Sequence, residues 1–327
     1  MIISQTPLRI SFAGGGSDIP AFYKKSPGAV VSTAINKYIY ITVNKKFDNQ
    51  IRASYTSTET VSHPDELKHE LIRESLKLAG IYNGIEITSI SDIPSGTGLG
   101  SSSTFTVGLI NALNAYSGTY SSPRDLAENA CNIEIIKCHK PIGKQDQYAS
   151  AYGGLNFIEF NTSGEVNVTP IIIKPNKFET LEKNLLLMYT GITRSADTIL
   201  SDQNKNVSKG DAAFSDLKQM VELAKELNKS LSAGDLNKFG EIMDENWNLK
   251  KKLTKQMSNP QIERWYELGK KNGALGGKIL GAGGGGFLLF YAPASKHSKI
   301  IDALPKLAPT PFKFESNGSR IVYYKPR

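Results

Sequence analysis

The sequence predicts an α+β protein that is divided into two domains. Its 327 residues fit two domains at roughly 150 residues each. The first half alternates β-branched stretches with helical patterns, whereas long amphipathic helices dominate the second half. Because the pattern changes at about residue 165, we expect one domain over residues 1–165 and a second over residues 166–327.

Local patterns predict the elements of the first half. Residues 29–43 are rich in β-branched and aromatic side chains, which predicts paired strands. Isoleucines indicate a strand over residues 85–90, and apolar residues on one helical face indicate a helix over residues 105–116. A capping serine and a first-turn proline begin another helix, which we expect to cover residues 122–138.

In the second half, a predicted strand near residues 184–189 precedes the amphipathic helices. Gly234 ends one of these helices, and Asn259-Pro260 begins another. The C-terminal part is predicted to form a strand over residues 287–291, a helix, and a hairpin that turns at Asn317-Gly318.

The composition is that of a folded, basic protein. Hydrophobic residues make up 39% of the chain and charged residues 21%, which leaves ample apolar surface for a core and excludes disorder as the main state. With 39 basic and 31 acidic residues the formal charge is +8, which favours an anionic partner. Nucleic acid, a membrane surface and a phosphorylated small molecule all fit that charge.

Features that the sequence lacks indicate the cellular compartment of the protein. The chain has only two cysteines, Cys131 and Cys138, which excludes a disulfide framework and a metal site made of cysteines alone. No run approaches the ~18 apolar residues of a membrane-spanning helix, and the first residues lack the charged-then-apolar order of a signal peptide. We therefore expect a cytoplasmic protein without a membrane partner.

A loop rich in glycine and serine carries the clearest chemical signal. Glycines let the backbone approach a ligand with unscreened N–H groups, and serines that open a helix place its positive dipole end where phosphate would lie. Serine hydroxyls there can bond phosphate oxygens or ligate magnesium. A plain glycine-rich turn is the alternative, and we favour phosphate binding. The residues are Pro94, Gly96, Gly98, Gly100, Ser101, Ser102 and Ser103.

Two common nucleotide-binding motifs do not fit. No segment supplies the G-x-x-x-x-G-K-[ST] of a Walker loop. Gly281, Gly283 and Gly286 match G-x-G-x-x-G, but a predicted strand follows them where a dinucleotide-binding fold needs a helix. The Rossmann interpretation is therefore rejected.

A second chemical cluster lies within residues 141–154. Asp146 follows a predicted helix end, on a segment of small and polar residues with little apolar periodicity. Glu134 lies on the preceding predicted helix. Taken alone, an aspartate in a polar loop is as readily a turn former or a solvated charge as a catalytic group.

The order of these segments resembles that of the GHMP kinases, the family of galactokinase, homoserine kinase, mevalonate kinase and phosphomevalonate kinase. The matching segments are Arg9 followed by Gly-Gly-Gly-Ser-Asp18, the glycine–serine loop, Gly-Lys-Gln-Asp146-Gln, and Leu-Gly-Ala-Gly-Gly-Gly-Gly286. The resemblance covers nearly the whole chain. It implies a ribosomal-protein-S5-like N-terminal α/β domain, a ferredoxin-like C-terminal α+β domain, and ATP and Mg²⁺ as cofactors.

The resemblance also implies roles for individual residues. The glycine–serine loop would wrap the ATP phosphates, and Ser102, Ser103 and Glu134 would hold magnesium. Asp146 would accept the proton of a sugar hydroxyl, or orient that hydroxyl and stabilise the loss of its proton. Arg9 would keep Asp146 charged and face the transferring phosphoryl group.

On the acceptor side, the resemblance implies that Asp18 binds sugar hydroxyls and that glycines give room for the ring. Two segments, 12–24 and 141–154, are most similar to the family members that phosphorylate the anomeric C1 hydroxyl of D-glycero-D-manno-heptose 7-phosphate. The product would be the 1,7-bisphosphate, a precursor of nucleotide-activated heptose for bacterial polysaccharide. The expected substrate-binding residues beside Asp18 are Gly14, Gly15, Gly16, Ser17, Gly283 and Gly284.

A sugar that already carries a phosphate needs a second anion site. Arg194 is the preferred candidate because it follows a predicted strand and a glycine, where a fork-shaped donor could reach inward. Lys144, Lys24 and Lys25 are the other candidates.

Two alternatives stay open, and a third, nucleic-acid binding, is not expected. The chain could be another sugar-1-kinase, such as an L-fucokinase or a galactokinase-like enzyme, although Gly15-Gly16-Ser17-Asp18 stands where galactokinase has Gly-Glu-His-Thr-Asp. It could be a catalytically inactive sugar sensor, which would be expected to lose Asp146 or the serines. Nucleic-acid binding would need clustered basic residues with aromatic platforms. Runs such as Lys250-Lys251-Lys252 are short and mixed with acids, so we interpret them as solvated faces. Monomer and homodimer both remain open.

Overall fold

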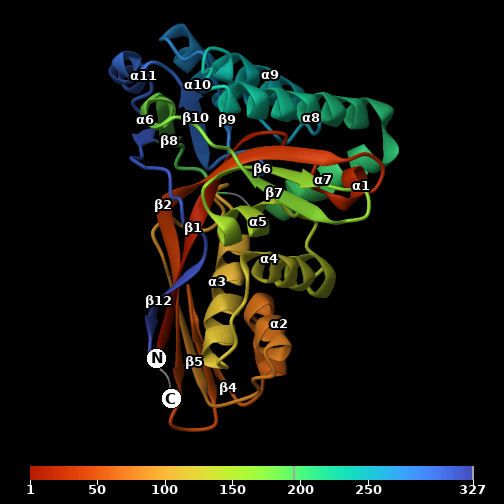
Figure 1. The fold of residues 1–327 in the computed structure, drawn as a ribbon, viewed down its shortest axis with the longest axis vertical. Coiled ribbons are helices and arrows are strands. Elements are labelled where there is room, and N and C mark those ends of the chain that lie inside the picture. The colour runs from red at the N-terminus through yellow and green to blue at the C-terminus, as the bar shows by residue number, and fades with distance from the viewer. Residues whose placement is uncertain (194–195, 326–327) are drawn as a thin grey trace.

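The computed structural model describes residues 1–193 and 196–325, which form two β-sheets with helices packed against each (Figure 1). The first sheet has the strand order β12-β1-β2-β5-β3-β4, and β6 and β7 extend it beside β2. Only β3 and β5 pair in parallel. Its strands are β1 (Ile2–Ala13), β2 (Gly28–Lys45), β3 (Ile51–Ser54), β4 (Thr58–Val61), β5 (Ile85–Ser91), β6 (Leu155–Phe160), β7 (Val166–Pro170) and β12 (Arg320–Tyr324).

Helices cover one face of this sheet (Figure 1). The central helix is α3, which packs on β1 and β2 and is enclosed by α2, α4 and α5. This enclosure explains why α3 is buried on most of its circumference. The helices are α1 (Pro20–Tyr23), α2 (Glu70–Leu78), α3 (Ser101–Tyr116), α4 (Pro123–Cys131), the π-helical segment η2 (Asn132–Lys137) and α5 (Gln145–Tyr152), with a 3₁₀ turn at Pro64–Glu66.

The second sheet is antiparallel, in the order β11-β8-β10-β9. Helix α9 packs on β9 and on α8, and α8 also contacts β1 and β2 of the first sheet. The elements are α6 (Pro175–Lys183), β8 (Leu185–Tyr189), α7 (Ala196–Lys209), α8 (Asp211–Ser232), α9 (Phe239–Lys252), α10 (Pro260–Lys271), β9 (Gly276–Ile279), β10 (Phe287–Tyr291), a 3₁₀ turn at Ala294–Lys296, α11 (His297–Ala303) and β11 (Ala308–Pro309).

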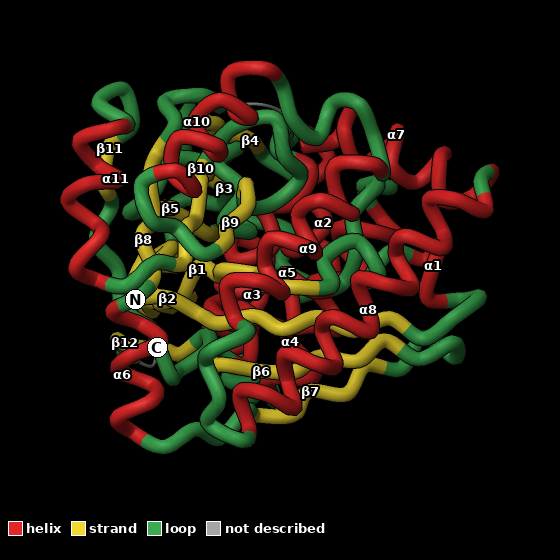
Figure 2. The backbone as a smooth tube through the Cα atoms, turned by 90° about the horizontal axis from the view of Figure 1, so that it is seen from above, coloured by secondary structure: helices red, strands yellow, loops and turns green. Residues whose placement is uncertain are grey.

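The two halves share one hydrophobic core. A single buried cluster runs from Leu8 and Leu109 in the first half to Leu217 and Phe239 in the second. Phe12 of β1 meets the ring of Phe239 edge-on, with centroids 5.2 Å apart. Seen from above, α8 and α9 run across the strands of the first sheet (Figure 2). Because this cluster spans both halves, packing fixes the positions of the side chains that the two halves bring together.

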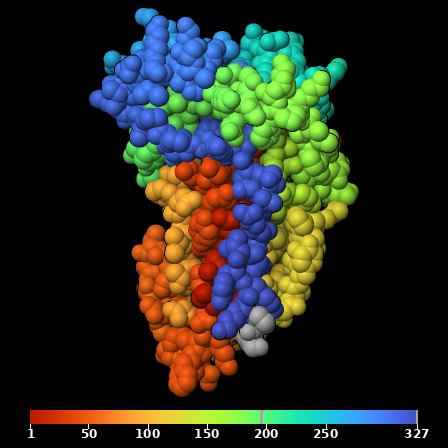
Figure 3. Space-filling view, turned by 60° about the vertical axis from the view of Figure 1, so that its left-hand side comes forward, coloured from red at the N-terminus to blue at the C-terminus, as the bar shows by residue number. Residues whose placement is uncertain are grey.

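The C-terminal segment returns to the first sheet. β12 pairs with β1, with Ile2 opposite Tyr324, so the predicted hairpin at Asn317-Gly318 is wrong. Figure 3 shows this segment running down the face of the N-terminal strands. Gly318 packs so closely on the backbone at Ala151 that a Cβ would overlap it. The boundary at residue 165 stays a prediction, but β7 and β12, both beyond it, belong to the first sheet.

The α+β prediction is confirmed, with two corrections to its elements. Residues 29–43 form part of one long strand, because the segment contains no turn sequence and its two ends pair with β6 and β5. The helix predicted over 122–138 begins with the expected capping box at Ser122 but changes to π-helix at Asn132. Among residues 1–193 and 196–325, no helix is both long enough and apolar enough to cross a membrane.

Candidate active site

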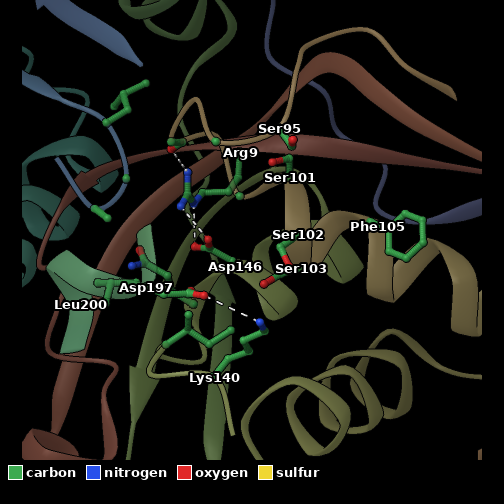
Figure 4. A pocket seen from close by; sticks show the side chains of 18 of the residues that line it. Arg9, Ser95, Ser101, Ser102, Ser103, Phe105, Lys140, Asp146, Asp197 and Leu200 are labelled. Atoms are coloured by element: carbon green, nitrogen blue, oxygen red, sulfur yellow. Dashed lines mark hydrogen bonds and ion pairs between the residues drawn. The ribbon is translucent and has the colours of Figure 1, made fainter. Parts of the chain in front are cut away.

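A cavity of about 910 Å³ lies between the two halves of the molecule. Its walls come from β1, the glycine–serine loop, α5, α7, α9 and the second glycine-rich loop. Figure 4 shows Arg9 and Asp146 joined inside it, with Ser101, Ser102 and Ser103 in the same pocket. Segments that lie far apart in the sequence thus converge on one hollow.

The glycine–serine loop supplies the wall from which α3 begins. Gly96, Gly98 and Gly100 have φ angles of 74°, 85° and 77°, a left-handed conformation that glycine adopts without strain. Gly100 is the N-cap of α3, so the serines that follow form its first turn beside the cavity. All seven residues predicted to bind nucleotide line the cavity.

The second glycine-rich loop, residues 281–286, packs against the first. A Cβ at Gly98 would overlap the carbonyl oxygen of Leu280, and a Cβ at Gly286 would overlap that of Thr97. Gly283 lines the cavity, whereas Gly284 is not among its lining residues and donates its N–H to the Met257 carbonyl at 2.9 Å. The second loop therefore packs against the first loop and also forms part of the cavity wall.

Asp146 and Arg9 form a bidentate ion pair at the cavity wall. Arg9 Nε and Nη2 donate to the two carboxylate oxygens of Asp146, each at 2.7 Å, and Arg9 Nη1 donates to the Gly98 carbonyl at 2.7 Å. Arg9 is 3% exposed and Asp146 24%, so the carboxylate keeps access to the cavity. The segment predicted as polar loop is helical here, and Asp146 lies in the first turn of α5.

Glu134 lies in the π-helical segment, behind the serines. Its carboxylate accepts hydrogen bonds from Ser102 Oγ at 2.8 Å and from Gln147 Nε2 at 2.6 Å. Burial raises the pKa of Glu134 to about 7, although hydrogen bonds from Ser103, Ser102 and Gln147 lower it in part. Glu134 is fully buried and has no cationic neighbour within the described residues, a costly arrangement that a bound cation would relieve.

These residues fit a magnesium ion. Hydroxyl and carboxylate oxygens are the hard ligands that Mg²⁺ prefers, and Mg²⁺ is usually held by one or two carboxylates together with substrate phosphates and water. No group of three or more acidic, histidine or cysteine side chains gathers as a metal site within the described residues. A single carboxylate beside the glycine–serine loop suits a metal that arrives with a nucleotide.

Asp18 also lines the cavity. Its carboxylate accepts the Gly16 N–H at 2.9 Å, the Gln145 N–H at 3.1 Å and the Gln145 side-chain amide at 3.3 Å. Burial raises the pKa of Asp18, while the backbone hydrogen bonds lower it. Gly143 packs so closely on Asp18 that a Cβ would overlap the carboxylate.

The neighbouring predicted residues divide into lining and supporting positions. Gly16 lines the cavity. Ser17 is buried and its hydroxyl donates to the carbonyls of Gly14 and Ala29, so it braces the turn. Gly14 donates its N–H to Asn246 of α9, and Gly15 lies against Ser11 and Gln145. Ser17, Gly14 and Gly15 thus shape the turn that presents Gly16 and Asp18.

Two functional candidates come from helices of the second half that sequence reasoning did not single out. Gln203 of α7 lines the cavity beside Gly16, is 1% exposed, and its Nε2 has no hydrogen-bond partner within the described residues. Lys250 of α9 lines the cavity at 5% exposure and donates to the Gly281 carbonyl at 2.8 Å. The interpretation of the Lys250-Lys251-Lys252 run as a solvated face is therefore wrong for Lys250.

The structure describes three of the four residues proposed for a second anion site, and none of the three lines the cavity. Lys144 points away from the cavity, because its Nζ donates to the Gly164 carbonyl at 2.7 Å and lies 5.1 Å from the centroid of the Tyr23 ring. Lys24 and Lys25 are exposed and do not line the cavity. Arg194 lies outside the described residues.

Lys140, which was not predicted, does line the cavity. It is paired with Glu70 and lies 3.7 Å from Asp197, as the dashed line in Figure 4 marks. The carboxylates of Glu70 and Asp197 therefore compete with any anionic ligand for the Lys140 ammonium.

One end of the cavity is apolar and aromatic. The ring of His69 lies 4.6 Å from that of Tyr55 and 5.2 Å from that of Phe105, measured between centroids. Ile39 and Ile93 line the same cavity. Figure 4 shows Phe105 at the far side of the serines from Leu200. A planar apolar group fits this end, and charged groups fit the other.

Comparison with known proteins agrees with this geometry. The family model described as the GHMP kinases N terminal domain matches residues 67–154, and the model described as GHMP kinases C terminal matches residues 216–310. The D-glycero-alpha-D-manno-heptose 7-phosphate kinase of Campylobacter jejuni is 34% identical over 320 residues, covering 93% of each chain.

Two further relatives extend the comparison. The L-fucokinase/L-fucose-1-P guanylyltransferase of Bacteroides fragilis is 27% identical over 95% of this chain and 37% of that protein. The crystal structure of a D-glycero-D-manno-heptose 1-phosphate kinase from Bacteriodes thetaiotaomicron superposes with a TM-score of 0.83, covers 99% of this chain and 100% of that one, and is 24% identical, which supports the fold. With both family models matched and a relative of 34% identity along almost its whole length, this chain belongs to the GHMP kinases.

Proposed function

We propose that this protein is an ATP-dependent kinase that phosphorylates the anomeric C1 hydroxyl of D-glycero-D-manno-heptose 7-phosphate and yields the 1,7-bisphosphate. The observation that carries the proposal is the Arg9–Asp146 pair, which faces a cavity formed on one side by the glycine–serine loop and on the other by Asp18. The 34% identity to a heptose 7-phosphate kinase supports the choice of sugar.

The nucleotide would lie along the first loop. Its phosphates would meet the left-handed glycines and the first turn of α3, where backbone N–H groups and the helix dipole favour negative charge. Its base would occupy the apolar end beside Tyr55, His69 and Phe105. Ser102, Ser103 and Glu134 would hold Mg²⁺, which neutralises phosphate charge when bound.

The reaction then needs one proton acceptor. The C1 hydroxyl of the sugar gives its proton to the Asp146 carboxylate, its oxygen bonds to the γ-phosphorus of ATP, and the bond from that phosphorus to ADP breaks. Arg9 holds the carboxylate with two hydrogen bonds, so that one orientation faces the cavity. Asp146 can equally act by orienting the hydroxyl, in which case the proton passes to an oxygen of the transferred phosphoryl group.

The sugar would be recognised by polar groups that the fold leaves available. Within the described residues, the buried Nε2 of Gln203 and the side-chain oxygen of Gln145 have no hydrogen-bond partner. Each would gain a hydroxyl of the bound ring, which relieves the cost of a buried polar group without a hydrogen bond. Asp18 completes this acceptor site.

The retained machinery argues against an inactive sugar sensor, because Asp146, Arg9 and the serines all line one cavity. The test is ADP release from Mg-ATP in the presence of heptose 7-phosphate, unphosphorylated heptose, mannose, L-fucose and galactose. We expect heptose 7-phosphate to give the highest kcat/KM, with ³¹P NMR showing a new phosphate on the anomeric carbon. Turnover of fucose or galactose without turnover of heptose 7-phosphate would overturn the substrate assignment.

A further inference from the structure

Lys250 is a buried ammonium at the point where the two glycine-rich loops touch. Within the described part of the chain, its Nζ donates one hydrogen bond, to the Gly281 carbonyl. An ammonium carries three N–H donors. Two donors of Lys250 are therefore available to a group inside the cavity that it lines.

The two loops hold Lys250 and Arg9 in equivalent ways. Arg9 donates to the carbonyl of Gly98, and Lys250 donates to the carbonyl of Gly281. Gly98 and Gly281 lie in contact, so closely that a Cβ on Gly281 would overlap the Gly98 backbone. Touching glycines thus tether two cations, one from each half of the chain, beside the same carboxylate.

Within the described residues, the two acids that act on Lys250, Asp18 and Asp146, are hydrogen-bonded to other groups. Arg9 is already paired with Asp146, and Lys278 of β9 is fully buried behind it, with its Nζ 3.2 Å from the Phe12 carbonyl. Burial and Arg9 lower the pKa of Lys250 to about 8, while Asp18 and Asp146 act in the opposite direction. No ion pair joins Lys250 to an acid within the described residues. Because a buried charge without a counter-charge is costly, the arrangement favours an anion at this point.

We infer that Lys250 is a catalytic residue that binds the transferring phosphoryl group as it passes from ATP to the acceptor. The inference rests on the proposed phosphoryl transfer. In that reaction negative charge spreads over the equatorial oxygens of the γ-phosphoryl group, and preorganised cations stabilise it. Lys250 comes from α9 in the second half of the chain, and the first turn of α3, which lines the same cavity, would supply the other donors.

Neighbouring lysines on the same helix provide matched controls. Lys251 pairs with Glu263 at 2.9 Å, and Lys252 is 62% exposed. We would compare Lys250→Met, Lys250→Arg and Lys252→Met in the full chain. Methionine keeps the apolar stem and removes the charge, so the fold is retained, which thermal unfolding checks.

We expect Lys250→Met to lower kcat by about 100-fold or more, the loss typical of one donor to a developing oxyanion, with the KM for ATP changed by less than about threefold. Lys250→Arg should recover at least about a tenth of the wild-type kcat, and Lys252→Met should match the wild type. If Lys250→Met keeps kcat within about threefold of wild type, or raises only the KM for the sugar, the inference is wrong.

A second measurement needs no sugar and so separates this inference from the substrate assignment. Aluminium fluoride with Mg-ADP mimics the transferring group, and we expect it to tighten ADP binding to the wild type by about tenfold or more. Lys250→Met should bind ADP normally and lose that gain, whereas a lysine that only braces the Gly281 loop would not affect the gain. A wild type that shows no gain, or a Lys250→Met variant that keeps it, would count against Lys250. Failure of heptose 7-phosphate as substrate leaves this result intact.

Discussion

The two glycine-rich loops have similar sequences and different roles. In both, several glycines have positive φ angles. The loop at 94–100 leads into α3, so its glycines expose backbone N–H groups to the cavity. The loop at 281–286 leads into β10, and its glycines make room for the backbone of the first loop. The two loops pack against each other, but only the first, which leads into a helix, presents the N-terminal turn of a helix to the cavity.

The largest expected effect tests whether the chemistry belongs to the first loop, to which Arg9 ties Asp146. Asp146→Asn should lower kcat by about 1,000-fold, because the amide cannot take the proton, while the affinity for ATP changes little. Steady-state kinetics and nucleotide titration measure both quantities. Asp48→Asn, at an exposed aspartate, is the control. An Asp146→Asn enzyme of unchanged kcat would remove Asp146 as the proton acceptor.

The second prediction tests whether the other loop is a packing element. Gly286→Ala should destabilise the protein by about 3 kcal/mol, because the Cβ would overlap the Thr97 carbonyl and the φ of 84° disfavours alanine. Gly80 also has a positive φ but has open space around it, so Gly80→Ala should cost only about 1 kcal/mol. Urea unfolding compares the two variants. Equal losses would contradict tight packing between the loops.

A third prediction concerns the serines that follow the first loop. Ser102→Ala should raise the Mg²⁺ concentration for half-maximal activity by about tenfold, because Ser102 and Glu134 are the proposed ligands. Ser95→Ala is the matched control, since Ser95 lines the same cavity and Glu134 takes its hydrogen bonds from other residues. A titration of activity against Mg²⁺ checks both variants. An unchanged requirement in Ser102→Ala would place the metal elsewhere.

The smallest expected effect is on the pH dependence of activity. It concerns Lys250, which donates a hydrogen bond to Gly281 of the second loop. Burial and Arg9 disfavour the ammonium of Lys250 while Asp18 and Asp146 favour it, and the pKa of Lys250 is lowered to about 8. Since the lysine is charged below its pKa, kcat/KM should fall to half as pH rises to about 8 and continue to fall above it. Lys250→Arg should remove this limb from the pH profile. A limb that persists in Lys250→Arg would belong to another group.

The sequence predicted those parts of the site that local motifs carry. The loop of glycines and serines, Arg9, Asp18 and Asp146 all meet at one cavity, as expected from their order along the chain. The π-helical turn that presents Glu134 could not be predicted, because its residues fit an ordinary helix. Lys144 was misplaced because its position in the motif says nothing of which neighbours its long side chain finds.

Lys250 had a signal in the sequence that the lysine run obscured. The buried face of α9 carries Phe239, Met243 and Trp247, and Lys250 follows at the next helical step. A charged residue on an apolar stripe is a candidate for a buried functional group. Gln203 had no comparable signal, because only the tertiary packing of α7 brings it beside Gly16.

The pairing of β12 with β1 has a consequence for how the chain is made. During synthesis, β1 emerges before its partner β12, which follows all the other described strands along the chain. Until then the outer edge of β1 presents unpaired backbone groups, which can recruit other strands. Arg9 lies on this same strand, so the Arg9–Asp146 pair is assembled on an element whose sheet is completed only after the second half has been synthesised. Removing β12 should therefore destabilise the sheet of the N-terminal half. We expect a chain truncated before β12 to aggregate.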